Sequence, residues 1–318
     1  MYSSCFGRDG LKLRKAFARA VDLRRWLHRR LPEELDRWPR TEPLADHVPA
    51  PDARTDHLDH TLRPWPMVLD SSRPAPDGAG ADSPALRRAL AELEIDQDVA
   101  VPRCARGTLG PVAARARLGA FLDNDLAAYA DQRRRLGDTS QLSPALHHGH
   151  LGVHEVLARV FEREPWHPDD ADPGLAGRRS GWWGLSEGAE AWLDQLVTWR
   201  ELGWNQALFD PAHRDYASLP AWARATLDEH RDDPRPWTYD RAAFEAAETH
   251  DALWNAAQRQ LVREGRIEGY LRMLWGKLIL EWSASPEEAH ATCLALNDRY
   301  ARDGRDPNSY SAIHWVFG

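Results

Sequence analysis

The chain has 318 residues, of which 41 are Lys or Arg and 49 are Asp or Glu, so its formal net charge is −8. Hydrophobic residues make up 42% of the sequence, and no window approaches the roughly 18 consecutive apolar residues of a membrane span. Cys5, Cys104 and Cys293 lie far apart, which argues against a disulfide framework and a zinc finger. We expect no role in a bilayer, and because the N-terminus has no secretory segment we expect the cytoplasm.

Tryptophan is the most unusual feature of the composition. The 15 Trp outnumber the 7 Phe and 7 Tyr together, and 12 of them fall between Trp166 and Trp315. An indole ring is large, oxidisable and able to stack on planar rings, so this density hints at a bound aromatic cofactor. A Trp-rich hydrophobic core is the alternative, and composition alone favours the core.

The first 105 residues read as an incomplete beginning. In an Arg-rich segment, apolar residues recur at the spacing of a helix; they are Leu23, Trp26, Leu27, Leu31 and Leu35. Residues 39–84 carry many prolines and no sustained periodicity of apolar residues, which is typical of a linker. From residue 106 onward helical periods dominate, and no series of alternating strands occurs. The sequence therefore predicts a mostly α protein, with a linker and domain remnant over 1–105 and a helical domain over 106–318.

The clearest helix is expected over residues 266–282. Its apolar residues follow the i, i+3/i+4, i+7 rule and place Trp275 and Trp282 on one face. About 10 Å of helical rise separates these two residues, so we expect their rings to approach one another. Ser285 begins a capping box for the next helix. Asn297 lies beside the inner stripe of that helix, where an amide needs a partner.

Two more helices are predicted from their caps. Asp240 can cap a helix that carries Phe244, Ala247, Trp254 and Leu261. Ser186 can cap a helix that carries Trp192, Leu196 and Trp199.

The segment TSQLSPALHHGHLG, residues 139–152, carries the first sign of chemistry. Three hydroxyls within five residues precede a proline-started helix, where side chains, backbone N–H groups and the helix dipole can hold phosphate oxygens. An ordinary capped loop is the favoured interpretation of such a string taken alone. His150 and His154 have the i, i+4 spacing of a metal pair, but no carboxylate or Cys completes the site, and we expect no metal.

Three further strings follow this segment in order. They are WRELGWN at 199–205, THDALWNAAQRQLVREGRIEGYLRMLWGKLILEW at 249–282 and LNDRYARDGRDPNSY at 296–310. Together with SQLSPALHHGH, they closely resemble the FAD-binding helical domain of class II cyclobutane pyrimidine dimer DNA photolyases. The resemblance runs from about residue 115 to 318, and residues 6–35 resemble the segment that joins the two domains in bacterial members.

The resemblance implies a flavoenzyme of the photolyase and cryptochrome family. In that family, light-excited reduced FAD passes an electron to a pyrimidine dimer flipped out of UV-damaged double-stranded DNA; neither a membrane nor an obligate protein partner is implied. The matching cofactor positions are Tyr129, Thr139, Ser140, Leu142 and Ser143 on the phosphate and ribose side, and Arg272, Asn297 and Asp303 at the flavin ring. Arg272 is expected to pair with Asp303, and Asn297 to face the flavin N5 atom.

The same resemblance assigns the tryptophans. Trp254, Trp275 and Trp282 match a chain of indole rings that re-reduces photoexcited flavin, with plain core packing as the alternative. The positions on the substrate side are Arg133, Gln195, Trp199, Met273 and Trp315. Trp199 and Trp315 are expected to clasp the dimer by stacking.

The sequence departs from the family at several points. Gln195 stands where the family has a glutamate that hydrogen-bonds the dimer, and Arg134 where it has an asparagine. The chain looks like a fragment, because the family has an α/β domain before the linker and further helices after residue 318.

Three functions follow from the resemblance. The first is a DNA photolyase, the second a non-catalytic flavoprotein of the cryptochrome kind, and the third a truncated product that binds FAD poorly. The net charge of −8 opposes DNA binding, so a local basic face is needed. Its candidates are Arg133–Arg135, Arg178, Arg179 and Arg214.

Overall fold

A computed structural model describes residues 15–36, 88, 91–95, 97–98, 110–133, 135 and 139–318. No strand occurs among these residues, which confirms the predicted mostly α class. No helix in these ranges has both the length and the apolar character that a bilayer crossing demands. The predicted linker over 39–84 lies outside the described residues, as do Cys5, Cys104 and Arg134.

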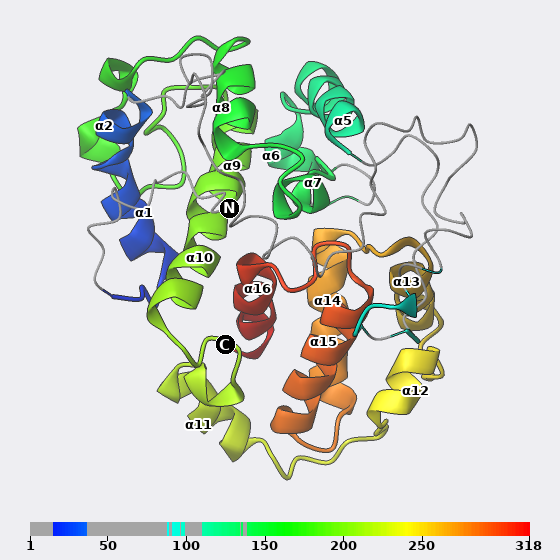
Figure 1. The fold of residues 1–318 in the computed structure, drawn as a ribbon. Coiled ribbons are helices and arrows are strands. Elements are labelled where there is room, and N and C mark those ends of the chain that lie inside the picture. Colours follow the sequence, from blue (N-terminus) through cyan, green and yellow to red (C-terminus); the bar gives the residue numbers. More distant parts are fainter. Residues whose placement is uncertain are drawn as a thin grey trace, which may run out of the picture. The chain divides into compact units, whose positions relative to one another are not determined.

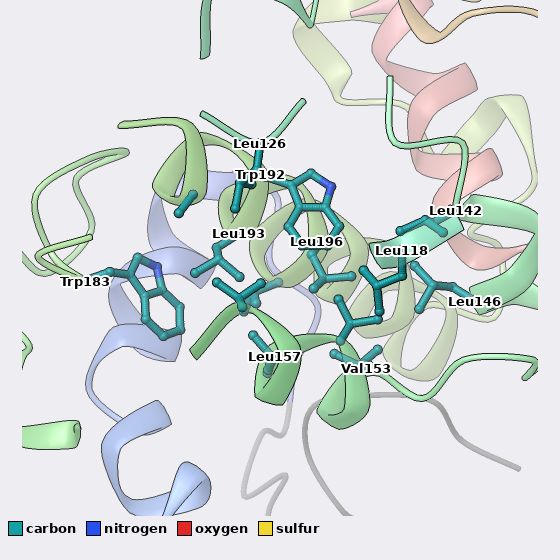
Figure 2. Close-up of a cluster of buried hydrophobic side chains, with 14 of the residues drawn as sticks. Leu118, Leu126, Leu142, Leu146, Val153, Leu157, Trp183, Trp192, Leu193 and Leu196 are labelled. Carbon is teal, nitrogen blue, oxygen red and sulfur yellow. The ribbon is translucent and has the colours of Figure 1, made fainter. Parts of the chain in front are cut away.

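The chain divides into two compact units, one of residues 1–38 with 102–318 and the other of residues 39–101. The larger unit begins with short helices: α1 (Ala20–His28), α2 (Leu31–Leu35), α5 (Pro111–Asn124), α6 (Tyr129–Gln132), α7 (Ser143–His147), α8 (Val153–Phe161) and α9 (Glu187–Leu193). Two 3-10 turns, η1 (Pro168–Asp170) and η2 (Pro173–Leu175), precede α9. The apolar faces of these elements meet in one buried cluster, the first core, which includes Leu118, Leu142, Val153, Leu157, Trp192 and Leu193 (Figure 2).

The second half of this unit has longer helices. They are α10 (Arg200–Phe209), α11 (Ala221–Glu229), α12 (Arg241–Ala246), α13 (Ala252–Glu264), α14 (Gly269–Trp282), α15 (Pro286–Tyr300) and α16 (Pro307–Phe317), with a 3-10 turn η4 (Tyr216–Ser218) before α11. Helix α14 lies beside α15, and α10 beside α16 (Figure 1). A second buried cluster, the second core, fills the space between α13, α14, α15 and α16 and contains Trp254, Trp275 and Trp282.

The structure contains the predicted caps, but the helix that Asp240 begins is shorter than expected. The hydroxyl of Ser186 accepts from Ala189 N, and that of Ser285 from Glu288 N. Asp240 caps a helix as expected, but α12 ends at Ala246 because Ala247 turns into the left-handed region at φ 58. Asp251 then caps α13, which carries Trp254 and Leu261.

A π-helical turn, η3 (Asp194–Trp199), joins α9 to α10. Helices of this type are rare and are found mostly at functional sites. The turn carries Gln195 and Trp199, the two residues of this segment that the sequence assigned to the substrate side. The wider π turn therefore sets the direction in which both side chains leave the helix.

The N-terminal helices pack on the same unit. Leu23, Leu27, Leu31 and Leu35 are each at most 2% exposed, as their spacing predicts, although the helix breaks between α1 and α2. Arg24 on α1 forms a two-pronged ion pair with Asp194 on η3, at 2.7 and 3.0 Å, and the arginine side chain is 3% exposed. That the first 105 residues are a remnant of an α/β domain stays a prediction.

The buried amide of Asn205 on α10 holds the chain before α1. Its Oδ1 accepts from the backbone N–H of Phe17 at 2.7 Å, and its Nδ2 donates to the backbone carbonyl of Lys15 at 3.1 Å. Sequence reasoning did not find this contact, since a helical Asn gives no sign of a partner 190 residues away. The contact fixes where the N-terminal segment enters the helical unit.

Helices α10 and α16 approach closely at Gly203. A Cβ atom at this position would lie 2.6 Å from the backbone nitrogen of Asn308 and 2.8 Å from the carbonyl carbon of Pro307. Backbone atoms cannot move aside as the end of a flexible side chain can. We therefore expect Gly203→Ala to lower the free energy of unfolding by about 2 kcal/mol, measured by urea denaturation.

Gly119 on α5 provides the control for this substitution. Nothing lies within 4 Å of a Cβ atom added there, so Gly119→Ala is expected to raise the stability by roughly 0.5–1 kcal/mol through the better helix propensity of alanine. If Gly203→Ala were as stable as the parent chain, the close approach of α10 and α16 would be wrong.

Candidate cofactor and substrate site

One ion pair joins α14 to the segment between α15 and α16. Arg272 on α14 donates from Nη2 to Asp303 Oδ1 at 3.1 Å, and the two side chains are 21% and 14% exposed. Ser143, the first residue of α7, hydrogen-bonds to the same carboxylate. Three elements that are distant in sequence thus meet at Asp303, as the sequence analysis expected for the first two.

The charge of this site follows from its contacts. Burial by itself would raise the pKa of Asp303, but the guanidinium of Arg272 and the hydrogen bond from Ser143 outweigh burial and hold the pKa below its usual value. The carboxylate is therefore ionised at neutral pH, and a hydrogen bond between two charged groups is stronger than a neutral one.

Two arginine nitrogens carry unused donors, one on Arg272 itself and one on Arg302, the residue that precedes Asp303. The Nε atoms of Arg272 and Arg302 are buried and have no hydrogen-bond partner among the described residues. A buried donor without a partner costs about 1–3 kcal/mol. Acceptors from a bound molecule, such as those of a flavin nucleotide, would satisfy both, so these residues fit a polar cofactor.

The hydroxyl segment is held firmly on both sides. Thr139 Oγ1 donates to Glu268 Oε2 at 2.8 Å, just before α14. Arg117 on α5 donates to the backbone carbonyls of Thr139 and Ser140, each at 2.9 Å. Leu142 is 1% exposed and anchors the segment in the first core. Because α7 has only five residues, its helix dipole contributes little to this segment.

Two histidines on this segment reach the chain beyond α15. His147 Nδ1 lies 3.0 Å from Asp306 Oδ2, and His148 Nε2 lies 2.9 Å from the carbonyl oxygen of Arg302. The hydrogen bond to Asp306 raises the pKa of His147 against the opposing effect of burial. These contacts connect α7 with residues 302–306 at a second place besides Ser143 and Asp303.

A pH dependence follows from the His147–Asp306 pair. Because the pKa of His147 is raised in the folded chain, the pair contributes its full share to the free energy of unfolding below the ordinary histidine pKa. This share is lost as the pH rises through the raised pKa. At pH 6 we expect His147→Gln to be about 1 kcal/mol less stable than the parent chain, with the difference vanishing in alkaline buffer. Urea denaturation at both pH values measures this difference in stability.

Asn297 lies on the buried side of α15, as predicted, and is 2% exposed. Its Nδ2 donates to Asp298 Oδ1 across 3.4 Å, a long contact that leaves the amide weakly bound. Asp298 is itself held by the Tyr310 hydroxyl at 3.1 Å. Tyr129, the remaining cofactor candidate, is 8% exposed in the first core with Leu142, and burial raises the pKa of its phenol.

The three tryptophans of the second core form a chain of neighbouring rings. Trp254 is the middle member: its ring lies 6.4 Å from that of Trp275, nearly parallel at 3°, and 6.3 Å from that of Trp282. Trp254 Nε1 donates to the carbonyl oxygen of Trp275 at 3.1 Å, and Trp275 Nε1 to Gln258 Oε1 at 3.0 Å. The rings of Trp275 and Trp282, which were expected to approach one another, both contact the indole of Trp254, which α13 places between them.

More aromatic rings follow this chain than the sequence indicated. Trp282 contacts the rings of Tyr239 at 6.2 Å and His250 at 4.7 Å, and His250 stacks on Trp237 at 4.7 Å. Neither Tyr239, His250 nor Trp237 was singled out from the sequence. The dense occurrence of Trp was the only available signal, and it did not say which rings touch.

The residues assigned to the substrate side lie on several elements. Trp199 at the end of η3 and Trp315 on α16 meet edge to face at 5.1 Å, and Trp315 is 56% exposed. Met273 follows Arg272 on α14 and packs partly buried against the second core. Gln195 on η3 and Arg133 at the end of α6 are both half-buried. The structure thus brings Trp199 and Trp315 together.

The histidine-rich segment shows no metal-binding arrangement in the ranges that the structure covers. No group of three or more His, Cys, Asp or Glu side chains there is placed to hold an ion. His148 and His150 instead have their rings 6.0 Å apart, and His147 contacts Asp306.

Similar proteins share one function. The chain is 33% identical to a deoxyribodipyrimidine photo-lyase of Oryza sativa subsp. japonica over 256 residues, which cover 79% of this chain and 46% of that protein. It is 31% identical to a deoxyribodipyrimidine photo-lyase of Potorous tridactylus over 262 residues, covering 82% of this chain and 45% of that protein. A deoxyribodipyrimidine photo-lyase of Methanothermobacter thermautotrophicus is 45% identical over 126 residues, covering 40% and 28%. No family model matches the chain.

Among solved structures, a bacterial class III photolyase from Agrobacterium tumefaciens resembles the chain with a TM-score of 0.46 and 20% identity, over 66% of this chain and 38% of that one. The sequence relatives support the photolyase/cryptochrome family for this protein. The chain spans less than half the length of each of the three relatives above.

Proposed function

We propose that this chain is the helical catalytic part of a class II, FAD-dependent deoxyribodipyrimidine photolyase, working in the cytoplasm on cyclobutane pyrimidine dimers in DNA. The observation that carries the proposal is the meeting of Arg272, Asp303 and Ser143 at one partly buried ion pair. A charged pair of this kind next to an unused donor is suited to the polar edge of a flavin. Bound reduced FAD supplies the light-driven electron that splits the dimer.

The chain's own residues bind and orient this cofactor. Ser140 supplies a hydroxyl donor for a phosphate or ribose oxygen, whereas the hydroxyls of Thr139 and Ser143 donate to Glu268 and Asp303 and offer only their acceptor lone pairs to ribose hydroxyls. Arg117 and Glu268 keep this segment in place. Asp303 holds the guanidinium of Arg272 in place, while the Nε of Arg272 remains available as a donor. The weakly held amide of Asn297 can exchange its contact with Asp298 for one with the flavin ring.

The substrate is proposed to be a dimer flipped out of UV-damaged double-stranded DNA. A flipped pyrimidine pair exposes planar faces that aromatic side chains bind by stacking. Trp199 and Trp315 provide such faces from two different elements, and one of them is largely exposed. Met273 is proposed to contact the same dimer and Arg133 the DNA backbone near it, since local arginines must overcome the overall charge of −8.

The experiment is repair of a defined thymine dimer. The purified chain is reconstituted with FAD, reduced, mixed with an oligonucleotide duplex that contains one dimer, and illuminated with blue light. Repair measured by chromatography, absent in the dark and absent without FAD, is the expected result. A chain that binds no flavin contradicts the proposal at its first step, and a flavin-loaded chain that leaves the dimer intact contradicts it at the second.

A second candidate function rests on Gln195. An amide on η3 can donate a hydrogen bond but cannot supply a proton, unlike the carboxyl group that the resemblance leads one to expect there. This difference favours a flavoprotein of the cryptochrome kind, in which light changes the redox state of the flavin without repair. Gln195→Glu separates the two, because a large gain of repair in this variant would mean that the parent chain has lost the reaction.

A further inference from the structure

The chain of aromatic rings in the second core continues to the surface. The ring of His250 lies 4.7 Å from that of Trp282 and 4.7 Å from that of Trp237, on which it stacks at an interplanar angle of 16°. One imidazole therefore separates the two indoles, whose centroids are no more than twice that distance apart. Trp282 is 4% exposed and Trp237 is 50% exposed, so these rings lead from the core to solvent.

Tyr239 holds His250 in this position. The phenol oxygen of Tyr239 lies 3.0 Å from His250 Nδ1 and accepts from the backbone N–H of His250 at 2.9 Å. The backbone N–H of Tyr239 in turn donates to the carbonyl oxygen of Trp282 at 2.8 Å. An exposed histidine would otherwise be free to turn away. These hydrogen bonds keep its ring between the two indoles.

We propose that Trp237 is the solvent-exposed terminal electron donor of this aromatic chain, with His250 as the bridge from Trp282. The proposal rests on the function proposed above, because photoexcited flavin is the oxidant that starts the transfer. The other half-exposed indoles differ: Trp315 belongs to the substrate side, and Trp222 lies on α11, away from these rings.

The step balances without a further protein group. One electron passes from the Trp237 ring to the oxidised Trp282 ring, which returns to its neutral state. Trp237 then loses its indole N–H proton to water and becomes a neutral radical. A thiol or ascorbate in solution supplies one electron and one proton and restores it.

Exposure favours this end point for two physical reasons. Water solvates a positive charge far better than the apolar second core does, so a hole moves from the buried Trp282 to the surface. Loss of the indole proton to solvent then prevents the electron from simply returning. A buried terminal indole has neither advantage.

The test compares Trp237→Phe with Trp222→Phe in the full chain loaded with FAD. The flavin absorption bands give the rate of photoreduction under blue light with dithiothreitol, and transient absorption gives the lifetime of the tryptophan radical. We expect Trp237→Phe to slow photoreduction several-fold and to shorten the radical lifetime, while Trp222→Phe leaves both unchanged. Trp237→Tyr keeps an oxidisable ring and should recover part of the rate.

The outcomes separate this proposal from the one on which it rests. If Trp237→Phe matches the parent chain in both measurements, the terminal donor is another group, although the photolyase function stands. If Trp237→Phe and Trp222→Phe slow photoreduction equally, the effect is not specific to the stack and the assignment is also wrong. A parent chain without bound flavin overturns the proposed function itself.

Discussion

Trp254→Phe is expected to slow flavin photoreduction by more than an order of magnitude while leaving FAD bound. The indole of Trp254 contacts both Trp275 and Trp282, at 6.4 and 6.3 Å, so its removal interrupts the chain at its middle. Phenylalanine keeps most of the packing volume but is much harder to oxidise. The loss of the hydrogen bond to the Trp275 carbonyl is expected to cost about 1 kcal/mol of stability, too little to unfold the protein.

Absorption spectra during blue illumination with a thiol measure this effect. Trp183→Phe is the matched control, because Trp183 is equally buried but belongs to the first core and is outside the chain of rings that starts at Trp275. It should bind and photoreduce flavin like the parent protein. Normal photoreduction in Trp254→Phe would show that electrons take a route that avoids α13.

Asp303→Asn is expected to weaken FAD binding about tenfold or more, equivalent to about 1.4 kcal/mol or more. The substitution keeps the shape of the side chain but removes the charge that holds Arg272, which is only 21% exposed. A partly buried guanidinium without its counter-charge is destabilising, and we expect a further loss of about 2 kcal/mol in the free energy of unfolding. Ser143 also loses its charged acceptor, so the hydroxyl segment becomes less well placed.

The pH dependence of the same pair has a definite sign. The pKa of Asp303 is held below its usual value in the folded chain. The ionised carboxylate therefore contributes to the stability of the site above the usual carboxyl pKa, and this contribution is lost as the pH falls through the lowered pKa. FAD affinity of the parent chain should therefore fall in acid, and that of Asp303→Asn should show less of this fall.

Fluorescence titration with FAD measures both effects. Asp228→Asn is the control, since Asp228 pairs with Arg231 on the surface, where the two side chains are 61% and 36% exposed. An exposed ion pair is worth little, and this variant should bind FAD normally. Equal affinity of Asp303→Asn and the parent chain would remove the observation on which the proposed function depends.

Local patterns in the sequence were enough to predict the class of fold and most of its helices and caps. Helical periods depend on residues three and four apart, which lie within one segment, so the burial of Leu23, Leu27, Leu31 and Leu35 followed directly from their spacing. Caps are equally local, and Ser186 and Ser285 act as expected. The motif resemblance supplied the pairing of Arg272 with Asp303, which the structure contains.

Tertiary structure alone decided what lies between these elements. The place of Trp254 between Trp275 and Trp282 depends on how α13 packs on α14. The stack of Trp237 on His250 brings together the segments before and after α12. The hydrogen bond from the backbone N–H of Phe17 to Asn205 joins residues 188 positions apart in the sequence. Contacts of this kind arise from the crossing of helices and loops far apart in sequence, for which no local period or cap carries a signal.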